Sequence, residues 1–163
     1  MRKMSQYRIF VEKKDIYATE AKSLRHDLNE NLHLNLTNTR VINIYDLFNV
    51  NETELETAKQ NVLSEIVTDM TSDSIELSDK TYFAVEYLPG QYDQRADSAI
   101  QCIQLLTGND EVRVKSGKVI ILDGVQSKEE LAKIKNYYIN PIEMREKDLT
   151  APLQLDESIE IED

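Results

Sequence analysis

The chain has 163 residues, of which 40% are hydrophobic and 30% charged, and its formal net charge is −11. This length and composition are typical of one globular domain or of two small fused halves. Because so acidic a chain would be repelled by a phosphate backbone or an anionic membrane surface, we expect neither a nucleic-acid partner nor a membrane partner.

The sequence shows neither a signal peptide nor a membrane-spanning segment, and it contains one cysteine. The first ten residues lack the apolar segment of a signal peptide. The strongly apolar run Val119–Leu122 is far too short to span a bilayer. With a single cysteine, Cys102, the chain can form neither an intramolecular disulfide nor a multi-cysteine zinc site. These features predict a cytoplasmic protein.

The first 50 residues contain the pattern strand, helix, strand. Apolar and polar side chains alternate over 7–14, which predicts a strand. Ala21, Leu24 and Leu28 are spaced by three and four and predict one face of a helix. The apolar segment 40–48 then predicts a second strand.

A second helix follows. Asn51 with Glu54 three residues later is the signature of a helix N-cap. The expected apolar stripe of this helix consists of Leu55, Ala58, Val62 and Ile66. The segment 66–70 predicts a short final strand, and the polar run 71–80 is expected to link this half to the next.

The second half repeats these patterns. Alternation over 80–88 predicts a strand, and Ala96, Ala99 and Ile103 predict a helical face. Residues 111–122 fit either a hairpin or one long bent strand, because Ser116-Gly117 is a turn or bulge signal.

The last helix of this half also has a start signal. Ser127 and Glu130 predict a capping box. The stripe that follows consists of Leu131, Ile134, Tyr138 and Ile142, and 142–147 predicts a final strand.

Equivalent positions in the two halves lie at similar offsets. Equivalent residues of the first strands are 74 positions apart, those of the first helices 75 and those of the second helices 76. In the second strands, Val41 is matched with Val119, which is an offset of 78 positions. We therefore predict an α+β fold in which residues 1–148 form an internally duplicated domain. Its two β-α-β-α-β halves, 7–70 and 81–148, would place their helices on one face of a sheet. The tail 149–163 reads as an acidic linker.

Candidate catalytic residues are few. Cys102 lies beside the apolar stripe of its helix, so we interpret it as a core residue. His26 and His33 are two helical turns apart and lack a third ligand, so we interpret them as surface residues. The sequence contains no glycine-rich phosphate loop, and we expect no catalytic residue and no metal site in this chain.

One polar segment stands apart, Leu88–Ala99, with the sequence LPGQYDQRADSA. Pro89-Gly90 fits the centre of a type II turn, and Asp93 is a natural N-cap. Arg95 then falls in the first turn of a helix, where a cation opposes the helix dipole. Its partner is either a local carboxylate, Asp93 or Asp97, or a group in another domain.

Three segments carry a family resemblance: RIFVEKK near the start, AVEYLPGQYDQRADSAIQCIQLL in the middle and KNYYINPIEMREKDL near the end. They resemble the N-terminal domain of phosphoribosylformylglycinamidine synthase in its large single-chain form. This enzyme, also called formylglycinamide ribonucleotide amidotransferase, is the glutamine-dependent ligase of de novo purine biosynthesis. The N-terminal domain of that family resembles a fused pair of the small accessory subunits found in the split form of the enzyme.

The resemblance implies a structural role. The family's synthetase and glutaminase domains have no counterpart in these residues, so the chain is expected to bridge them and support ammonia transfer without catalysing a reaction itself. The linker 149–163 would lead toward these domains. ATP and magnesium are expected for the full-length enzyme, with no cofactor in this chain. The residues expected to face the other domains are Pro89, Gly90, Gln91, Asp93, Gln94, Arg95, Asp97 and Ser98. A stand-alone tandem regulatory module that binds a small ligand is the alternative.

Overall fold

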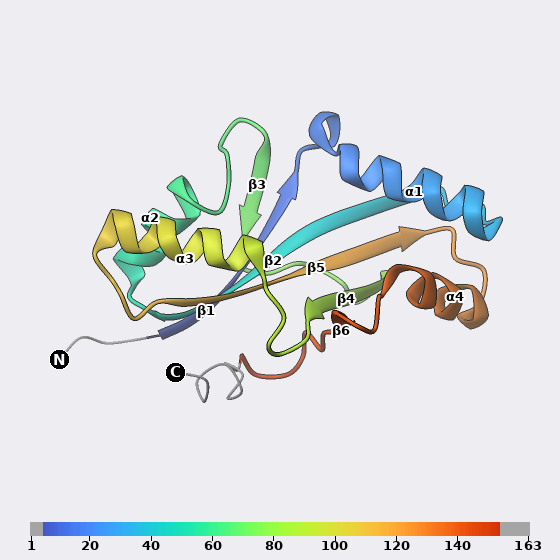
Figure 1. The fold of residues 1–163 in the computed structure, drawn as a ribbon. Coiled ribbons are helices and arrows are strands. Elements are labelled where there is room, and N and C mark those ends of the chain that lie inside the picture. The colour runs from blue at the N-terminus through green and yellow to red at the C-terminus, as the bar shows by residue number, and fades with distance from the viewer. Residues whose placement is uncertain (1–4, 154–163) are drawn as a thin grey trace.

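The computed structural model of the chain describes residues 5–153. Within this range the fold is α+β, with one six-stranded antiparallel sheet and four α-helices (Figure 1). The strands are β1 (Ser5–Lys13), β2 (Asn38–Val50), β3 (Asp69–Ser72), β4 (Thr81–Tyr87), β5 (Arg113–Asp123) and β6 (Met144–Glu146). The helices are α1 (Thr19–Leu32), α2 (Glu52–Asn61), α3 (Gln94–Thr107) and α4 (Lys128–Tyr138), with a short 3-10 turn, Asp15–Tyr17, before α1.

The strand order is β3-β1-β2-β5-β4-β6, and every neighbouring pair is antiparallel. The first three strands therefore occupy one half of the sheet and the last three occupy the other. In each half the first strand lies in the middle, the second lies at the centre of the sheet and the third forms an edge. Segment 111–122, which fitted either a hairpin or one strand, contributes to the single strand β5.

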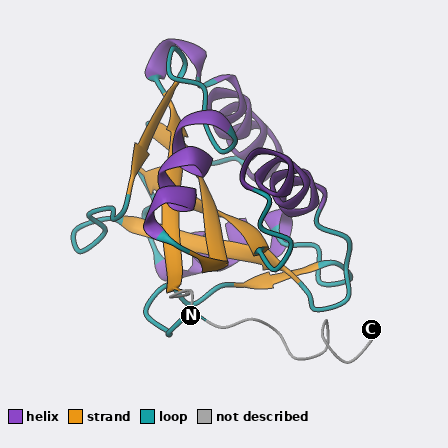
Figure 2. Cartoon of the chain, turned by 90° about the vertical axis from the view of Figure 1, so that its left-hand side faces the viewer, coloured by secondary structure: helices purple, strands orange, loops and turns teal. Residues whose placement is uncertain are grey.

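The four helices cover one face of the sheet, as predicted. In Figure 2, in which the fold is turned by 90°, helices are seen to the right of the orange strands and in front of them. Two clusters of buried side chains lie between this face and the helices. A third cluster, on the opposite face, consists of Phe10, Ile42, Ile44, Ala84, Val119 and Ile121. It is covered by Ile75 and Leu77 of the segment that links the halves and by Leu149.

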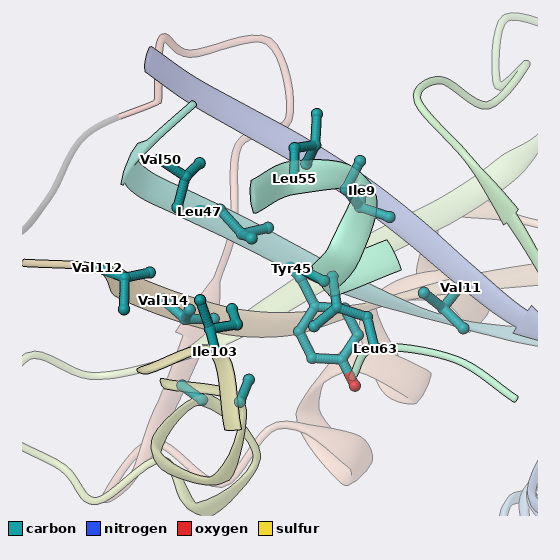
Figure 3. Close-up of a cluster of buried hydrophobic side chains, with 13 residues drawn as sticks. Ile9, Val11, Tyr45, Leu47, Val50, Leu55, Leu63, Ile103, Val112 and Val114 are labelled. Carbon is teal, nitrogen blue, oxygen red and sulfur yellow. The ribbon is translucent and has the colours of Figure 1, made fainter. Parts of the chain in front are cut away.

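Each helix-side cluster is built from both halves of the chain. The first combines Ile9 of β1, Leu47 of β2 and Leu55 of α2 with Ile103 of α3 and Val114 of β5 (Figure 3). In the second cluster, side chains of α1 and β2 meet side chains of β4, β5 and α4. As a result α2 packs beside α3, and α1 packs beside α4 (Figure 1).

The pairing register corrects one predicted alignment. Val11 pairs with Asn43, and Val85 pairs with Lys118. Val11 and Val85 are 74 residues apart, and their partners Asn43 and Lys118 are 75 residues apart. The alignment of Val41 with Val119 had required an offset of 78 residues. Those two residues lie on opposite faces of the sheet. The central strands are apolar on both faces, so a sequence match could not tell one face from the other.

Two details of the second helices were also predicted wrongly. Ile66 and Ile142, assigned to the apolar stripes, are 76% and 78% exposed and lie beyond the ends of α2 and α4. Each sits in a turn that leads into an edge strand. The reciprocal capping box forms at Asn51. At the start of α4 the predicted cap forms in part: the Ser127 hydroxyl accepts from the backbone N–H of Glu130 at 3.1 Å, but the Glu130 carboxylate accepts from the backbone N–H of Gln126.

A network of ion pairs lies on the face opposite the helices. The Asp46 carboxylate is buried; it accepts two hydrogen bonds from Arg8, at 2.7 and 3.1 Å, and lies 2.9 Å from the ammonium of Lys147. Lys147 also lies 2.9 Å from Glu86, which pairs with Arg145 at 2.8 Å. Burial alone would raise the pKa of Glu86, but hydrogen bonds and charge from Lys147 and Arg145 hold it below its ordinary value.

The C-terminal end of the described chain contributes to this face. Leu149, the first residue of the predicted linker, packs against the third cluster, and its carbonyl accepts a 3.2 Å hydrogen bond from Arg8.

We expect a chain that ends at Asp148 to lose about 1–2 kcal/mol of unfolding free energy relative to one that ends at Leu153, because it loses a half-buried leucine and this bond. Urea unfolding of both chains measures the difference. Equal midpoints would contradict the docking of Leu149. Residues 154–163 of the predicted linker lie outside the described residues.

Candidate functional site: a cleft between two helix pairs

The segment Leu88–Ala99 leads from β4 into α3. The backbone N–H of Gln91 donates to the carbonyl of Leu88 at 3.0 Å, and Gly90 has a φ of 87°. A glycine with positive φ at the third position is the requirement of a type II turn, so the predicted turn is confirmed. Pro89, Gly90 and Gln91 are exposed at its tip.

Asp93 anchors this segment inside the fold. Its carboxylate accepts from the backbone N–H of Ala96 at 3.0 Å, which confirms the predicted N-cap of α3. It also accepts from the backbone N–H and the hydroxyl of Ser116 on β5, at 2.9 and 2.7 Å. One side chain therefore starts the helix and fixes that start against the central sheet.

The first two turns of α3 line a cleft of about 540 Å³ on the helix-covered face. Among the residues predicted to face other domains, Gln94, Arg95 and Ser98 line this cleft. Asp97 does not, and its carboxylate accepts from Tyr92 at 3.1 Å and from Gln101 at 3.0 Å. The structure thus divides the predicted set between an exposed turn, a cap and a cleft wall, with Asp97 outside all three.

The cleft lies between the two helix pairs. Its floor is formed by the middle of the sheet, including Tyr45 of β2 and Lys118 of β5. Tyr138, from the C-terminal end of α4, closes the side opposite α3. A volume of this size is in the range of small-molecule sites.

Arg95 has neither of the local partners considered for it. Its guanidinium donates to the hydroxyl of Tyr45 at 3.3 Å, and within residues 5–153 it forms no ion pair with Asp93 or Asp97. The Tyr45 ring belongs to the first helix-side cluster, and its oxygen lies at the margin of that cluster (Figure 3). Burial by itself lowers the pKa of Arg95. The hydrogen bond to Tyr45 and nearby negative charge raise this pKa by more than burial lowers it, so Arg95 stays charged.

The other cation of the cleft is paired. The ammonium of Lys118 forms an ion pair with the carboxylate of Glu20 at the start of α1. Tyr138 packs edge-on against Phe83 with ring centroids 5.7 Å apart. Burial, together with the negative charge of Glu20, raises the pKa of Tyr138 to about 12, so its hydroxyl stays protonated at neutral pH.

The interpretation of Cys102 as a core residue was wrong. Its thiol is exposed, and the residue lines the cleft. The buried stripe of α3 is formed by Ala96, Ala99 and Ile103, and Cys102 lies on the flank of that stripe. His26 and His33 are exposed, as predicted.

Sequence reasoning missed Tyr45, Lys118 and Tyr138 as members of this site. Each sits within an apolar strand or helix pattern, which is typical of a core position. Strand alternation places Tyr45 on the helix-covered face, but nothing in the sequence shows that α3 and α4 leave a gap above it. The cleft exists only because helices from opposite halves pack in pairs at the two ends of the long strands.

Neither a protein-family model nor a curated protein matches this chain. Within residues 5–153, no group of three or more His, Cys, Asp or Glu side chains is placed to hold a metal ion. In the same range no helix is long and apolar enough to cross a membrane. The interpretation of the site therefore rests on its own residues.

Proposed function

We propose that this chain is the N-terminal structural and coupling domain of a glutamine-dependent phosphoribosylformylglycinamidine synthase. In this role it would bridge the synthetase and glutaminase domains in the cytoplasm and keep ammonia transfer coupled to the synthesis of the amidine. Support comes from the resemblance of the segment around Leu88–Ala99. The observation that carries most weight is that each helix-side core cluster is formed by both halves of the chain, as expected of two fused subunits that once assembled as a pair.

An internal duplication is part of this proposal. In its favour, α1 and α3 both have 14 residues and begin 75 residues apart, and both end at a left-handed residue, His33 and Gly108. The edge strands are also attached alike: Lys14 donates to the carbonyl of Thr68, and Leu88 donates to that of Glu143. Such repetition of helix length, cap and edge contact is what a duplicated and fused gene would produce.

The proposed contact surface for the other domains surrounds the exposed turn. Tyr92 is 69% exposed, and Ile142 is exposed at the neighbouring turn before β6. The Leu88–Glu143 backbone bond holds these two turns together. Exposed apolar and aromatic side chains next to polar ones are typical of a surface that another protein covers.

The catalytic chemistry would belong to the other domains. ATP, magnesium and glutamine would be bound there, and this chain would supply no catalytic side chain.

The proposal is tested by reconstitution. A family enzyme that lacks its N-terminal domain is mixed with this chain, and glutamate and amidine are both measured. Binding together with restored coupling supports the proposal, and a chain that neither binds nor changes the ratio of the two products refutes it.

Arg95 gives a sharper prediction. We expect Arg95→Gln to change the unfolding free energy of this chain by less than about 1 kcal/mol, because the loss of a long bond to a neutral hydroxyl is offset by the removal of a cation from the positive end of α3. In the assembled enzyme the same change is expected to raise the ratio of glutamate to amidine several-fold.

The control for this prediction is Lys133→Gln on the exposed side of α4, which should leave both quantities unchanged. A destabilised Arg95→Gln chain with normal coupling would assign Arg95 a purely local role.

The alternative is a stand-alone regulatory module that binds a small ligand. The cleft lined by Arg95 is the observation in its favour. Thermal unfolding against amino acids and nucleotides separates the two functions, because a regulatory module should show a large shift with one specific compound while a coupling domain should require its partner domains.

A further inference from the structure

The cleft contains a cation without an anionic partner. Arg95 is fixed at one wall by its bond to Tyr45, and within the described part of the chain no carboxylate lies within ion-pair distance of it. Arg95 is exposed at the edge of the cleft, and a guanidinium there without a carboxylate in ion-pair distance offers an anion both charge pairing and a planar fork of donors.

Three further polar side chains of the cleft can donate hydrogen bonds. Gln94, Ser98 and Tyr138 line the same cleft. Within residues 5–153 their side chains form no hydrogen bond, so their donors are available to a ligand. The hydroxyl of Tyr138, whose pKa burial raises to about 12, is protonated at neutral pH like that of an ordinary tyrosine and can donate.

The charge balance favours one negative charge over two. Lys118 is already paired with Glu20, so Arg95 is the cation of the cleft that has no ion pair, although the carboxylates of Glu20 and Asp93 lie near enough to act on its charge. A dianion such as a phosphate monoester would meet one unpaired cation and these two carboxylates. A monoanion would meet less repulsion from them.

Much of the rest of the cleft is apolar, but Glu86, which is paired with Lys147 and Arg145, and Ser116, which is bonded to Asp93, also line it. Val85, Ala99 and Met144 line it together with Val62 and Leu63 from the end of α2. A ligand that fits must therefore carry an apolar body as well as its anionic group, which is the usual composition of a small-molecule site.

We propose that this cleft binds a small organic monocarboxylate, with its carboxylate on Arg95 and its apolar body over Val85, Ala99 and Met144. This goes beyond the coupling function and is independent of it: its test uses this chain alone, whereas the coupling function is tested by reconstitution with the other domains.

The single cysteine of the chain reports on occupancy of the cleft. Cys102 is exposed and lines the same cleft, so a bound ligand should slow its reaction with a disulfide reagent such as DTNB. The probes are benzoate, its neutral isostere benzamide and the dianionic phenyl phosphate. We expect benzoate at millimolar concentration to slow modification saturably, by at least fivefold. Benzamide and phenyl phosphate should slow it less than twofold.

Variants identify the group that binds. Arg95→Gln should abolish protection by benzoate, Arg95→Lys should retain part of it, and Lys133→Gln, an exposed cation of α4, should retain all of it. Circular dichroism checks that each variant is folded. A second readout, the benzoate-induced rise in melting temperature, should follow the same order.

The proposal is overturned by any of four results. Benzamide that protects as well as benzoate would mean apolar binding without a role for charge. Stronger protection by phenyl phosphate would assign the site to phosphates. Protection that persists in the folded Arg95→Gln variant, or no saturable protection by benzoate at all, would remove Arg95 as the anion site.

Discussion

A chain cut between Asp73 and Ser74 is expected to give two fragments that do not fold alone and that fold together when mixed. In the intact chain, the first helix-side cluster joins Leu47 and Leu55 of the first fragment to Ile103 and Val114 of the second. The second cluster is divided in the same way. The loss of even a few fully buried aliphatic contacts, at about 1.5–3 kcal/mol each, exceeds the net stability of a typical domain.

The measurement is circular dichroism of each fragment and of their equimolar mixture, with sedimentation to give the mass. The mixture should show one cooperative transition and the mass of a 1:1 complex. If the halves are duplicates, each fragment could also form a homodimer. We expect such a homodimer to be weaker than the 1:1 complex, because the β2–β5 pairing and both clusters use different side chains on the two sides. A fragment that melts cooperatively as a monomer would show that its half has a core of its own.

Asp46→Asn is expected to be the most destabilising of the conservative substitutions discussed, at about 3–5 kcal/mol. The Asp46 side chain is 3% exposed and pairs with both Arg8 and Lys147. The amide keeps the shape but removes the charge, so two cations on this face lose their shared counter-ion. Removing one member of a buried ion pair costs this much because the remaining charge stays desolvated.

The matched control is Glu12→Gln. Glu12 also accepts two hydrogen bonds from an arginine on the same face of the sheet, Arg40, at 2.7 and 2.8 Å. Its pair is more exposed, at 18% for Glu12 and 39% for Arg40, so water screens it and the expected loss is about 1 kcal/mol or less. Urea unfolding of both variants gives the comparison. Equal losses would mean that burial of the Asp46 network adds nothing.

Local signals in the sequence were sufficient for the elements themselves. Helix starts at Asn51 and Asp93 are set by side chains that bond to backbone N–H groups within three residues, so their geometry is encoded nearby. The turn at Pro89-Gly90 follows from the two residues that form it. Alternation and spacing by three and four likewise placed the strands and the buried faces of α1 and α3, and with them the α+β class.

Only the tertiary structure decided how these elements combine. The pairing register of β2 and β5, the exposure of Cys102 and the docking of Ile75, Leu77 and Leu149 on the second face all depend on contacts between distant segments. The same holds for the cleft, where α3 from one half and the end of α4 face each other across strands from both halves. Sequence patterns report which side of an element is buried, because periodicity is local. They do not report what covers that side, because the choice depends on the packing of the whole chain.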